Sequence, residues 1–268
     1  MSLLAKYDPS NTSAYNAAAN ESYLSSGCEN LDKFLNGGFI KSGVTQIYGE
    51  AGVGKTQLAL QLCLTAQAPI GSIENPRVKS VAAYICTEAS FPANRLKQMI
   101  TKSPIVNRYP VISDKNIFID HVSSTEDLEN CIFNPFRLPQ LLKRHRVNVL
   151  VIDSIAATYR TEYESTLLRN RAKSLRKIGY GLHKIAKEHQ VSVVCLNQVS
   201  AVIGNTFDRV SRKEQPSLGI TWASMVTNSL YMFKRGNSRY VYVAGSSFLP
   251  RKFIEFEILE SGVRAKSS

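Results

Sequence analysis

The sequence predicts an α/β fold with a mostly parallel central sheet, helices on both of its faces and an antiparallel extension at the C-terminal end. Three observations predict this fold. From about Gly27 onward, strand-like and helix-like segments alternate, which is typical of doubly wound sheets. The strand-like segments are continuous apolar runs, as expected for parallel strands that are covered on both faces. After about Ser229 only strand-like segments joined by short turns remain.

The alternating part combines apolar, β-branched runs with segments rich in helix formers. The expected strands are Val44–Tyr48, Ser80–Cys86, Asn116–Asp120, Val147–Ile152 and Ser192–Leu196. The expected helices are Thr56–Ala66, Ala93–Thr101, Thr125–Lys143 and Leu167–His189. The antiparallel extension is expected from Leu230–Lys234, Arg239–Ala244 and Phe253–Leu259, with a hairpin turn at 235–238.

The chain divides into a short arm and one large domain. Residues 1–26 are rich in Ser, Asn and Ala and are expected to form a flexible N-terminal arm. Residues 27–268 show no internal repeat and are expected to form a single α/β domain, for which the length of 268 residues is sufficient.

Composition and charge narrow the class of protein. The net charge of +12, from 33 basic and 21 acidic side chains, favours a polyanionic partner. No apolar run approaches the length of a membrane span, and the segment Met1–Lys6 lacks the apolar core of a secretory signal. The five cysteines have no metal-ligand spacing, so we expect reduced thiols of the cytosol or nucleus and no zinc site.

The most specific motif is an eight-residue glycine loop, G-x-x-x-x-G-K-[ST]. It reads Gly49-Glu50-Ala51-Gly52-Val53-Gly54-Lys55-Thr56 and stands between an expected strand and an expected helix. The backbone N–H groups of such a loop converge on one point and bind an anion, assisted by the helix dipole. Lys55 adds a positive charge for the outer phosphates, and the Thr56 hydroxyl is a ligand for Mg²⁺. The loop therefore predicts a nucleoside triphosphate site; a chance glycine turn is the alternative.

Three polar residues directly follow expected strands, where ligands bind in open α/β sheets. Asp153 is the candidate to hold Mg²⁺ together with Thr56. Glu88 is the candidate to polarise the water that attacks the γ-phosphate, and Gln198 the candidate to sense that phosphate. Alternatives remain for the two acids. Asp153 can be a surface aspartate that ends a strand, and Glu88 a carboxylate that caps the next helix.

Two segments carry the residues expected to contact nucleic acid. Arg160 and Tyr163 follow Asp153 closely and combine a basic with an aromatic group, which suits single-stranded nucleic acid. The long segment Val199–Pro216 holds further basic residues that can contact phosphates, namely Arg209, Arg212 and Lys213. A solvated mobile loop is the alternative for the second segment.

These parts, in this order, resemble the eukaryotic RecA-type recombinases and their paralogues. The resemblance covers nearly all of the chain from Tyr23 to Gly262. Its markers are Gly54–Gln57, Tyr84–Glu88, Asn94–Leu96, Val151–Ser154, Asn197–Val199 and Pro216–Ala223.

The resemblance implies a RecA-like ATPase core that binds ATP with Mg²⁺ at residues 49–57 and Asp153. It implies that Glu88 is the catalytic base, that Lys55 and Gln198 assist it, and that Arg95 lies near the adenine. It also implies two DNA-facing loops, at about Arg160–Leu167 and Val199–Pro216.

The function implied by the resemblance is homologous-recombination repair of DNA breaks, including meiotic recombination, in the nucleus with some of the protein in the cytoplasm. The expected partners are single-stranded or branched DNA, another recombinase-family paralogue and the main strand-exchange recombinase, which the protein helps to assemble on DNA. Weak, DNA-stimulated ATPase activity is expected. Two alternatives remain: a self-sufficient strand-exchange ATPase, and a protein adaptor for which ATP is only a structural ligand.

Several positions depart from the strand-exchange members of the family. Their N-terminal helical domain has no counterpart in residues 1–26, where Tyr15–Ala18 loosely fits the aromatic-x-x-Ala motif that docks a neighbouring subunit. Ser224 stands where those members carry a histidine that senses the γ-phosphate, and Gly245 or Ser246 replaces an aspartate that caps ATP. These departures predict slow turnover and no self-assembled filament, without weakening ATP binding.

Overall fold

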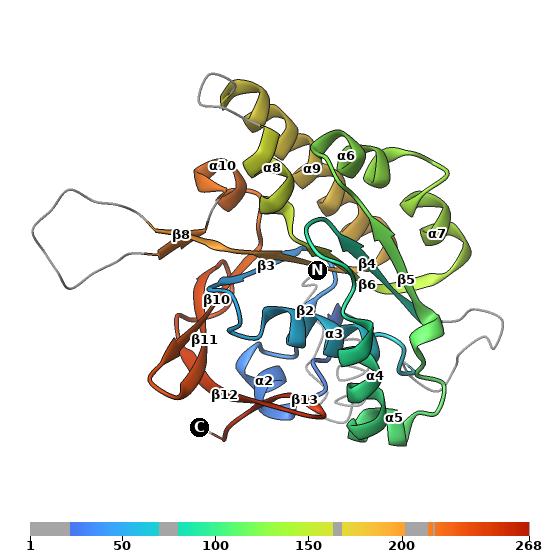
Figure 1. The fold of residues 1–268 in the computed structure, drawn as a ribbon, viewed down its shortest axis with the longest axis vertical. Helices are drawn as coiled ribbons and strands as arrows, with labels where there is room; N and C mark the ends of the chain where they lie inside the picture. The colour runs from blue at the N-terminus through green and yellow to red at the C-terminus, as the bar shows by residue number, and fades with distance from the viewer. Residues whose placement is uncertain (1–21, 70–79, 163–167, 202–213, 217, 268) are drawn as a thin grey trace, which may run out of the picture.

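The computed structural model describes residues 22–69, 80–162, 168–201, 214–216 and 218–267. A nine-stranded sheet runs through the molecule (Figure 1). Its strand order is β13 (Gly262–Ala265), β12 (Phe253–Leu259), β11 (Ser238–Ser246), β10 (Asn228–Arg235), β3 (Val44–Gly49), β7 (Ser192–Asn197), β6 (Arg146–Asp153), β4 (Ser80–Cys86) and β5 (Ile117–His121). The expected α/β fold and its strands are confirmed.

The strands from β10 to β5 are parallel, and the antiparallel part begins between β10 and β11. The register places Tyr48 beside Asn197 and Asp153 beside both Leu196 and Cys86. The carboxyl ends of β3, β7, β6 and β4 therefore meet at one edge of the sheet, where the phosphate loop also begins.

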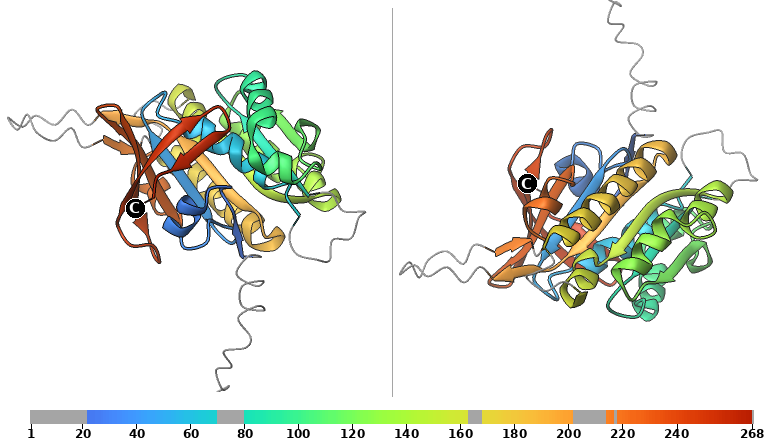
Figure 2. Two further views of the ribbon diagram at one scale, coloured as in Figure 1. Left: turned by 90° about the horizontal axis from the view of Figure 1, so that it is seen from below. Right: turned by 90° about the horizontal axis from the view of Figure 1, so that it is seen from above.

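Helices cover both faces of the sheet, as Figures 1 and 2 show. One face carries α2 (Glu29–Phe34), α3 (Lys55–Thr65), α4 (Ala93–Lys102) and α5 (Pro104–Arg108). The other face carries α6 (Thr125–Phe133), α7 (Leu138–Arg144), α8 (Ile155–Glu162), α9 (Leu168–His189) and α10 (Gly219–Ala223). A short 3₁₀ helix, Asp114–Asn116, precedes β5. Within the described ranges, no helix is both long and apolar enough to cross a bilayer.

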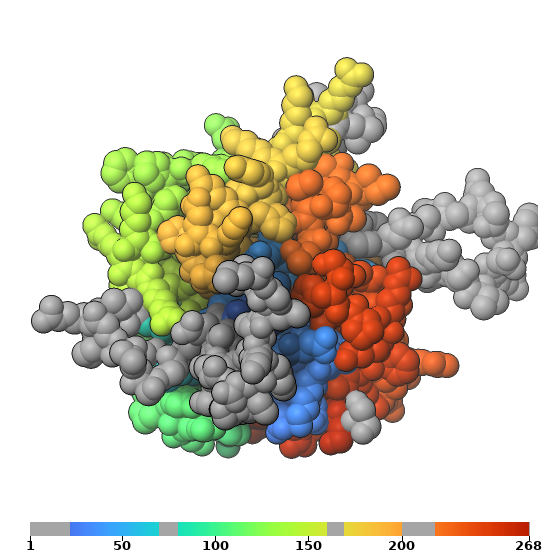
Figure 3. Space-filling model, turned by 180° about the vertical axis from the view of Figure 1, so that it is seen from behind, coloured from blue at the N-terminus to red at the C-terminus, as the bar shows by residue number. Residues whose placement is uncertain are grey.

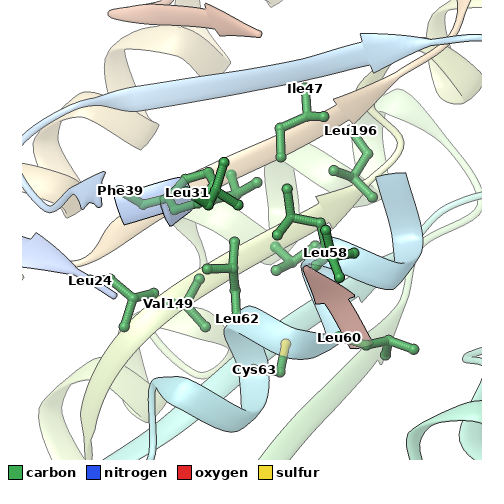
Figure 4. Packing of buried hydrophobic residues seen from close by; sticks show 14 of the residues in the cluster. Leu24, Leu31, Phe39, Ile47, Leu58, Leu60, Leu62, Cys63, Val149 and Leu196 are labelled. Carbon is green, nitrogen blue, oxygen red and sulfur yellow. The ribbon is translucent and has the colours of Figure 1, made fainter. Parts of the chain in front are cut away.

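Two apolar clusters fill the space between the sheet and its helices. Residues 58–65 of α3 are buried all round, as expected for a helix that is apolar on every side. Figure 4 shows Leu58 and Leu62 of this helix among residues of the sheet such as Val149 and Leu196. On the opposite face α9 buries a stripe of apolar side chains, and its outer side lies on the surface between α7 and the C-terminal strands (Figure 3).

The prediction of one helix over Thr125–Lys143 was wrong. The segment forms two helices, because α6 ends at Phe133 and α7 begins at Leu138. Pro135 is the physical reason, since a proline disfavours the helical conformation for the residue before it and cannot donate a helical hydrogen bond itself. Asn134 accordingly adopts an extended conformation, with φ −69° and ψ 123°.

Two small antiparallel ribbons flank the large sheet. In the first, β1 (Tyr23–Leu24) pairs with β2 (Phe39–Ile40), and Leu24 is buried in the core. In the second, β8 (Val199–Ala201) pairs with β9 (Glu214–Pro216). The first ribbon joins residues just before Gly27 to the fold; residues 1–21 lie outside the described part of the chain.

Candidate nucleotide-binding site

The glycine loop is held from outside by two strands of the large sheet, β10 and β12. A Cβ on Gly49 would lie 2.0 Å from the backbone oxygen of Met232 on β10, and one on Gly54 would lie 2.9 Å from Ile258 on β12. Gly54 also has a φ of +123°, and Gly52 a φ of +72°, in the left-handed region that favours glycine. Apart from Gly52 and its two chain neighbours, no residue has a heavy atom within 4 Å of the Cβ position of Gly52, so the backbone is open there. The loop is thus fixed at both ends and accessible in its middle.

Lys55 is the first residue of α3, and its side chain turns back over the loop. The ammonium Nζ donates hydrogen bonds to the backbone oxygens of Gly49, at 2.7 Å, and Glu50, at 2.8 Å. Burial lowers the pKa of Lys55, while the charges of Asp153, Glu50 and Glu88 oppose that shift. The cation therefore lies at the N-terminus of the helix, where backbone N–H groups also favour an anion.

Thr56 and Asp153 form the pair that the sequence suggested for a metal ion. The Thr56 hydroxyl donates to Asp153 Oδ2 at 3.2 Å, which joins the start of α3 to the end of β6. A third residue, Tyr84 of β4, donates its hydroxyl to the same oxygen at 2.7 Å. Burial, with the nearby charge of Asp153, raises the pKa of Tyr84 well above its usual range, so its hydroxyl stays protonated.

The sequence prediction did not include Tyr84 among the site residues. The sequence carried only half of the signal: alternation along the strand places Tyr84 on the same face as Cys86, but the pairing with β6 comes from the structure. Tyr84 lies opposite Val151, and Cys86 lies opposite Asp153, in the register of β4 with β6. Tyr84 therefore shares the face of the sheet to which Asp153 belongs.

Glu88 and Gln198 lie in contact just beyond the carboxyl ends of β4 and β7. Gln198 Nε2 donates to Glu88 Oε2 at 3.1 Å. Glu88 is exposed and Gln198 half-buried, so the carboxylate is in contact with solvent. The structure thus brings together two candidates that are 110 positions apart in the sequence.

A pocket of about 430 Å³ adjoins the loop. It is lined by Gly52, Gly54, Lys55, Thr56, Gln57, Arg95, Gln98, Ile258, Leu259 and Glu260. A pocket of about 480 Å³ beside Tyr23 and Arg108 contains none of the loop residues, so the smaller pocket is the candidate nucleotide site.

Arg95 closes one side of this pocket. Its guanidinium donates to Gln57 Oε1 at 2.6 Å, to the Leu259 oxygen at 2.6 Å and to the Glu260 oxygen at 3.1 Å. It also hydrogen-bonds Gln98. Arg95 was predicted near the adenine, whereas the turn between β12 and β13 and Gln98 were not predicted.

The donor set fits a nucleoside triphosphate with Mg²⁺. The N-terminus of the 11-residue helix α3, the open backbone at Gly52 and the Lys55 cation suit phosphate oxygens. The Thr56 hydroxyl and the Asp153 carboxylate are hard oxygen ligands of the kind that Mg²⁺ prefers.

The candidate DNA-contacting residues fall largely outside the described part of the chain. Tyr163, Arg209, Arg212 and Lys213 lie there, so their predicted role stays a prediction. The prediction that Arg160 begins a loop was wrong, because Arg160 lies within α8.

The start of α8 explains why the helix forms there. The N–H of Ala156 donates to Asn197 Oδ1 at 3.1 Å, and that of Ala157 donates to Ser154 Oγ at 3.3 Å. These side chains satisfy two first-turn N–H groups, which stabilises the helix.

The fold and this site define a P-loop domain of the RecA-like class. A family model described as Rad51 matches residues 20–266. The chain therefore belongs to the Rad51 family, which confirms the resemblance found in the sequence.

Individual relatives agree with the family match. The chain is similar to the DNA repair protein XRCC3 of Mus musculus, 37% identical over 219 residues, which cover 76% of this chain and 60% of that protein. It is similar to DNA repair protein XRCC3 of Bos taurus, 34% identical over 261 residues, or 90% of this chain and 74% of that protein. DNA repair protein rhp57 of Schizosaccharomyces pombe is 30% identical over 81% of this chain and 70% of its own length.

Proposed function

We propose that this protein is an ATP- and DNA-binding paralogue of the Rad51 family that acts in homologous-recombination repair of DNA breaks. It acts as a mediator that helps the main strand-exchange recombinase assemble on single-stranded DNA, in a complex with another paralogue. Its place of action is the nucleus, with some of the protein in the cytoplasm, and its role extends to meiosis. The relatives named as DNA repair proteins support this proposal.

One observation carries the nucleotide part of the proposal: Thr56 and Asp153 meet at 3.2 Å beside the glycine loop. Residues 49–57, Asp153 and Arg95 would hold ATP, and Thr56 with Asp153 would hold Mg²⁺. The metal would supply positive charge that neutralises phosphate oxygens. Lys55 adds a second positive charge, and Glu88 accepts a proton from water while Gln198 holds its carboxylate. A weak, DNA-stimulated ATPase is the activity that these residues support.

Retention of labelled ATP on a filter, with Mg²⁺ present, tests this function. The wild type is expected to retain ATP. The ATP affinity of Lys55→Ala should be lower by roughly 10- to 150-fold, because a hydrogen bond to a charged group contributes about 1.5–3 kcal/mol. Lys115→Ala, which removes an exposed lysine of the 3₁₀ helix before β5, serves as the charge-matched control. No retention by the wild type, or equal retention by Lys55→Ala, would overturn the nucleotide function.

Salt titration of single-stranded DNA binding separates the mediator from a pure protein adaptor. Each phosphate contact contributes a slope of roughly −0.7 to log affinity against log salt. Replacing Arg160, Arg209, Arg212 and Lys213 by alanine should make the slope shallower if they contact phosphates. Absent binding, or an unchanged slope, favours the adaptor. Electron microscopy with ATP and DNA addresses the other alternative, since long regular filaments of this chain alone favour a self-sufficient strand-exchange enzyme.

A further inference from the structure

One oxygen of the Asp153 carboxylate accepts hydrogen bonds from two hydroxyl groups. Tyr84 of β4 donates to Oδ2 at 2.7 Å, and Thr56 of α3 donates to it at 3.2 Å. The two hydroxyl donors differ in their second role at the site. Thr56 is a candidate metal ligand, whereas Tyr84 stands behind the carboxylate in the strand next to β6.

The surroundings of Tyr84 hold its hydroxyl in place. Its side chain is 1% exposed, and its ring packs edge-on against Phe91 with ring centroids 5.0 Å apart. Its backbone lies in the middle of β4, paired in register with Val151 on β6. A carboxylate rotates easily about its terminal torsion, so a fixed donor on one oxygen selects one orientation.

We infer that Tyr84 is a positioning residue for Mg²⁺, which orients the Asp153 carboxylate through its hydroxyl without touching the metal or the nucleotide. This inference rests on the proposed function, because it concerns the same nucleotide site. Hydrogen-bond partners behind a ligating carboxylate typically change metal affinity by about 10- to 100-fold when they are removed. Tyr84 occupies that place here.

Tyr84→Phe tests the inference, because it keeps the buried ring and removes only the hydroxyl. Binding of a fluorescent ATP analogue is titrated with Mg²⁺ and compared with binding in EDTA. The variant is expected to need about 10- to 100-fold more Mg²⁺ for the half-maximal gain in affinity. Its affinity in EDTA is expected to equal that of the wild type, which also shows that the variant is folded.

Tyr159→Phe is the matched control. Tyr159 is 2% exposed, and its hydroxyl also makes a 2.7 Å hydrogen bond, with Ser174 Oγ in the opposite core. Removing that hydroxyl costs a comparable buried hydrogen bond away from the carboxylate, so the Mg²⁺ requirement should stay at the wild-type value. A double variant adds a second check. Once Asp153→Ala has removed the carboxylate, Tyr84→Phe should have no further effect.

Three results would overturn the role of Tyr84: an unchanged Mg²⁺ requirement in Tyr84→Phe, an equal loss of affinity with Mg²⁺ and in EDTA, or an additive loss in the double variant. The second of these results would make Tyr84 a purely structural residue. Failure of the proposed function is distinguishable, because the wild type itself would then bind no analogue under either condition.

Discussion

The amide of Gln198 donates a hydrogen bond to the carboxylate of Glu88, with 3.1 Å between Nε2 and Oε2. The two residues follow β7 and β4, and β6 with its terminal Asp153 lies between these strands. Gln198 also directly precedes β8, one strand of the ribbon whose intervening segment holds Arg209, Arg212 and Lys213. The candidate base is therefore linked by one hydrogen bond to the start of a candidate DNA-contacting segment.

Glu88→Gln should separate ATP binding from hydrolysis. The glutamine keeps the shape of the side chain but cannot accept a proton, so the rate of ATP hydrolysis falls by about 100-fold or more while ATP retention is unchanged.

Gln198→Ala should keep ATP retention and lose the stimulation of hydrolysis by DNA. Phosphate release is the measurement, with Glu126→Gln on the exposed side of α6 as the control.

Hydrolysis by Glu88→Gln at the wild-type rate would remove Glu88 from the role of base. If DNA still fully stimulated ATP hydrolysis in Gln198→Ala, the hydrogen bond of Gln198 would not link DNA binding at the following segment to hydrolysis.

Gly49 and Gly52 form a matched pair for testing how the loop is held. A Cβ on Gly49 meets the backbone oxygen of Met232 at 2.0 Å, which no side chain rearrangement relieves. Gly49→Ala should therefore lower the free energy of unfolding by about 3 kcal/mol or more. Gly52→Ala meets no neighbouring atom within 4 Å, and only its φ of +72° is unfavourable, at a cost of about 1–2 kcal/mol.

Urea unfolding measures both variants, with the midpoints compared at a common slope. Equal destabilisation by the two alanines would mean that β10 does not fix the start of the loop.

Arg95 should stabilise the nucleotide pocket through its planar guanidinium. Arg95 bonds Gln57 through Nε and the Leu259 oxygen through Nη2, whereas lysine keeps the charge on a single nitrogen without this planar fork, so Arg95→Lys should lose about 1–3 kcal/mol of stability. At this chain length each kcal/mol corresponds to a fall in Tm of roughly 2–4 °C. ATP affinity should fall as well, because the turn between β12 and β13 lines the pocket.

Thermal unfolding and ATP retention are the measurements for Arg95→Lys. Arg108→Lys is the control, since Arg108 is exposed on α5, stacks over Tyr109 and does not line the nucleotide pocket. A fall in ATP affinity no larger than that of the control would contradict the assigned role.

The sequence was sufficient to predict those parts of the fold and the site whose signal lies in a short stretch of residues. The glycine loop and the apolar strands predicted the fold, because a parallel sheet needs apolar residues on both faces and a phosphate loop needs glycines at fixed spacing. The break between α6 and α7 was also a local signal, since Pro135 is visible in the sequence. The capping of α8 by Asn197 was not local, as it joins residues 41 positions apart.

The rest of the site depends on contacts between distant segments. Arg95 bonds oxygens 164 and 165 positions away, and the strand pairing of β10 with β3 joins the C-terminal strands to the loop. Nothing in the composition of either segment specifies its partner. Such contacts arise only once the sheet has assembled, so they required the structure.

The five cysteines lead to a prediction about thiol reactivity and pH. Cys28 is half-buried, whereas the other four are buried, and all five are free thiols. Burial raises the pKa of Cys86 to about 11 and that of Cys131 to about 12, and it raises the pKa of Cys63 and Cys195 further. The thiolate is the reactive form, so at pH 8 these four thiols are almost entirely protonated and shielded.

A chromogenic thiol reagent at pH 8 should therefore modify one thiol rapidly in the native protein and all five in denaturant. Cys28→Ser should abolish the rapid phase, while Cys131→Ser should leave it unchanged. Raising the pH toward 9.5 should speed the slow phase, because the thiolate fraction of a group with a pKa near 11 rises about tenfold per pH unit below that value. Two or more rapid thiols at pH 8 would contradict the burial of the other four cysteines in the core.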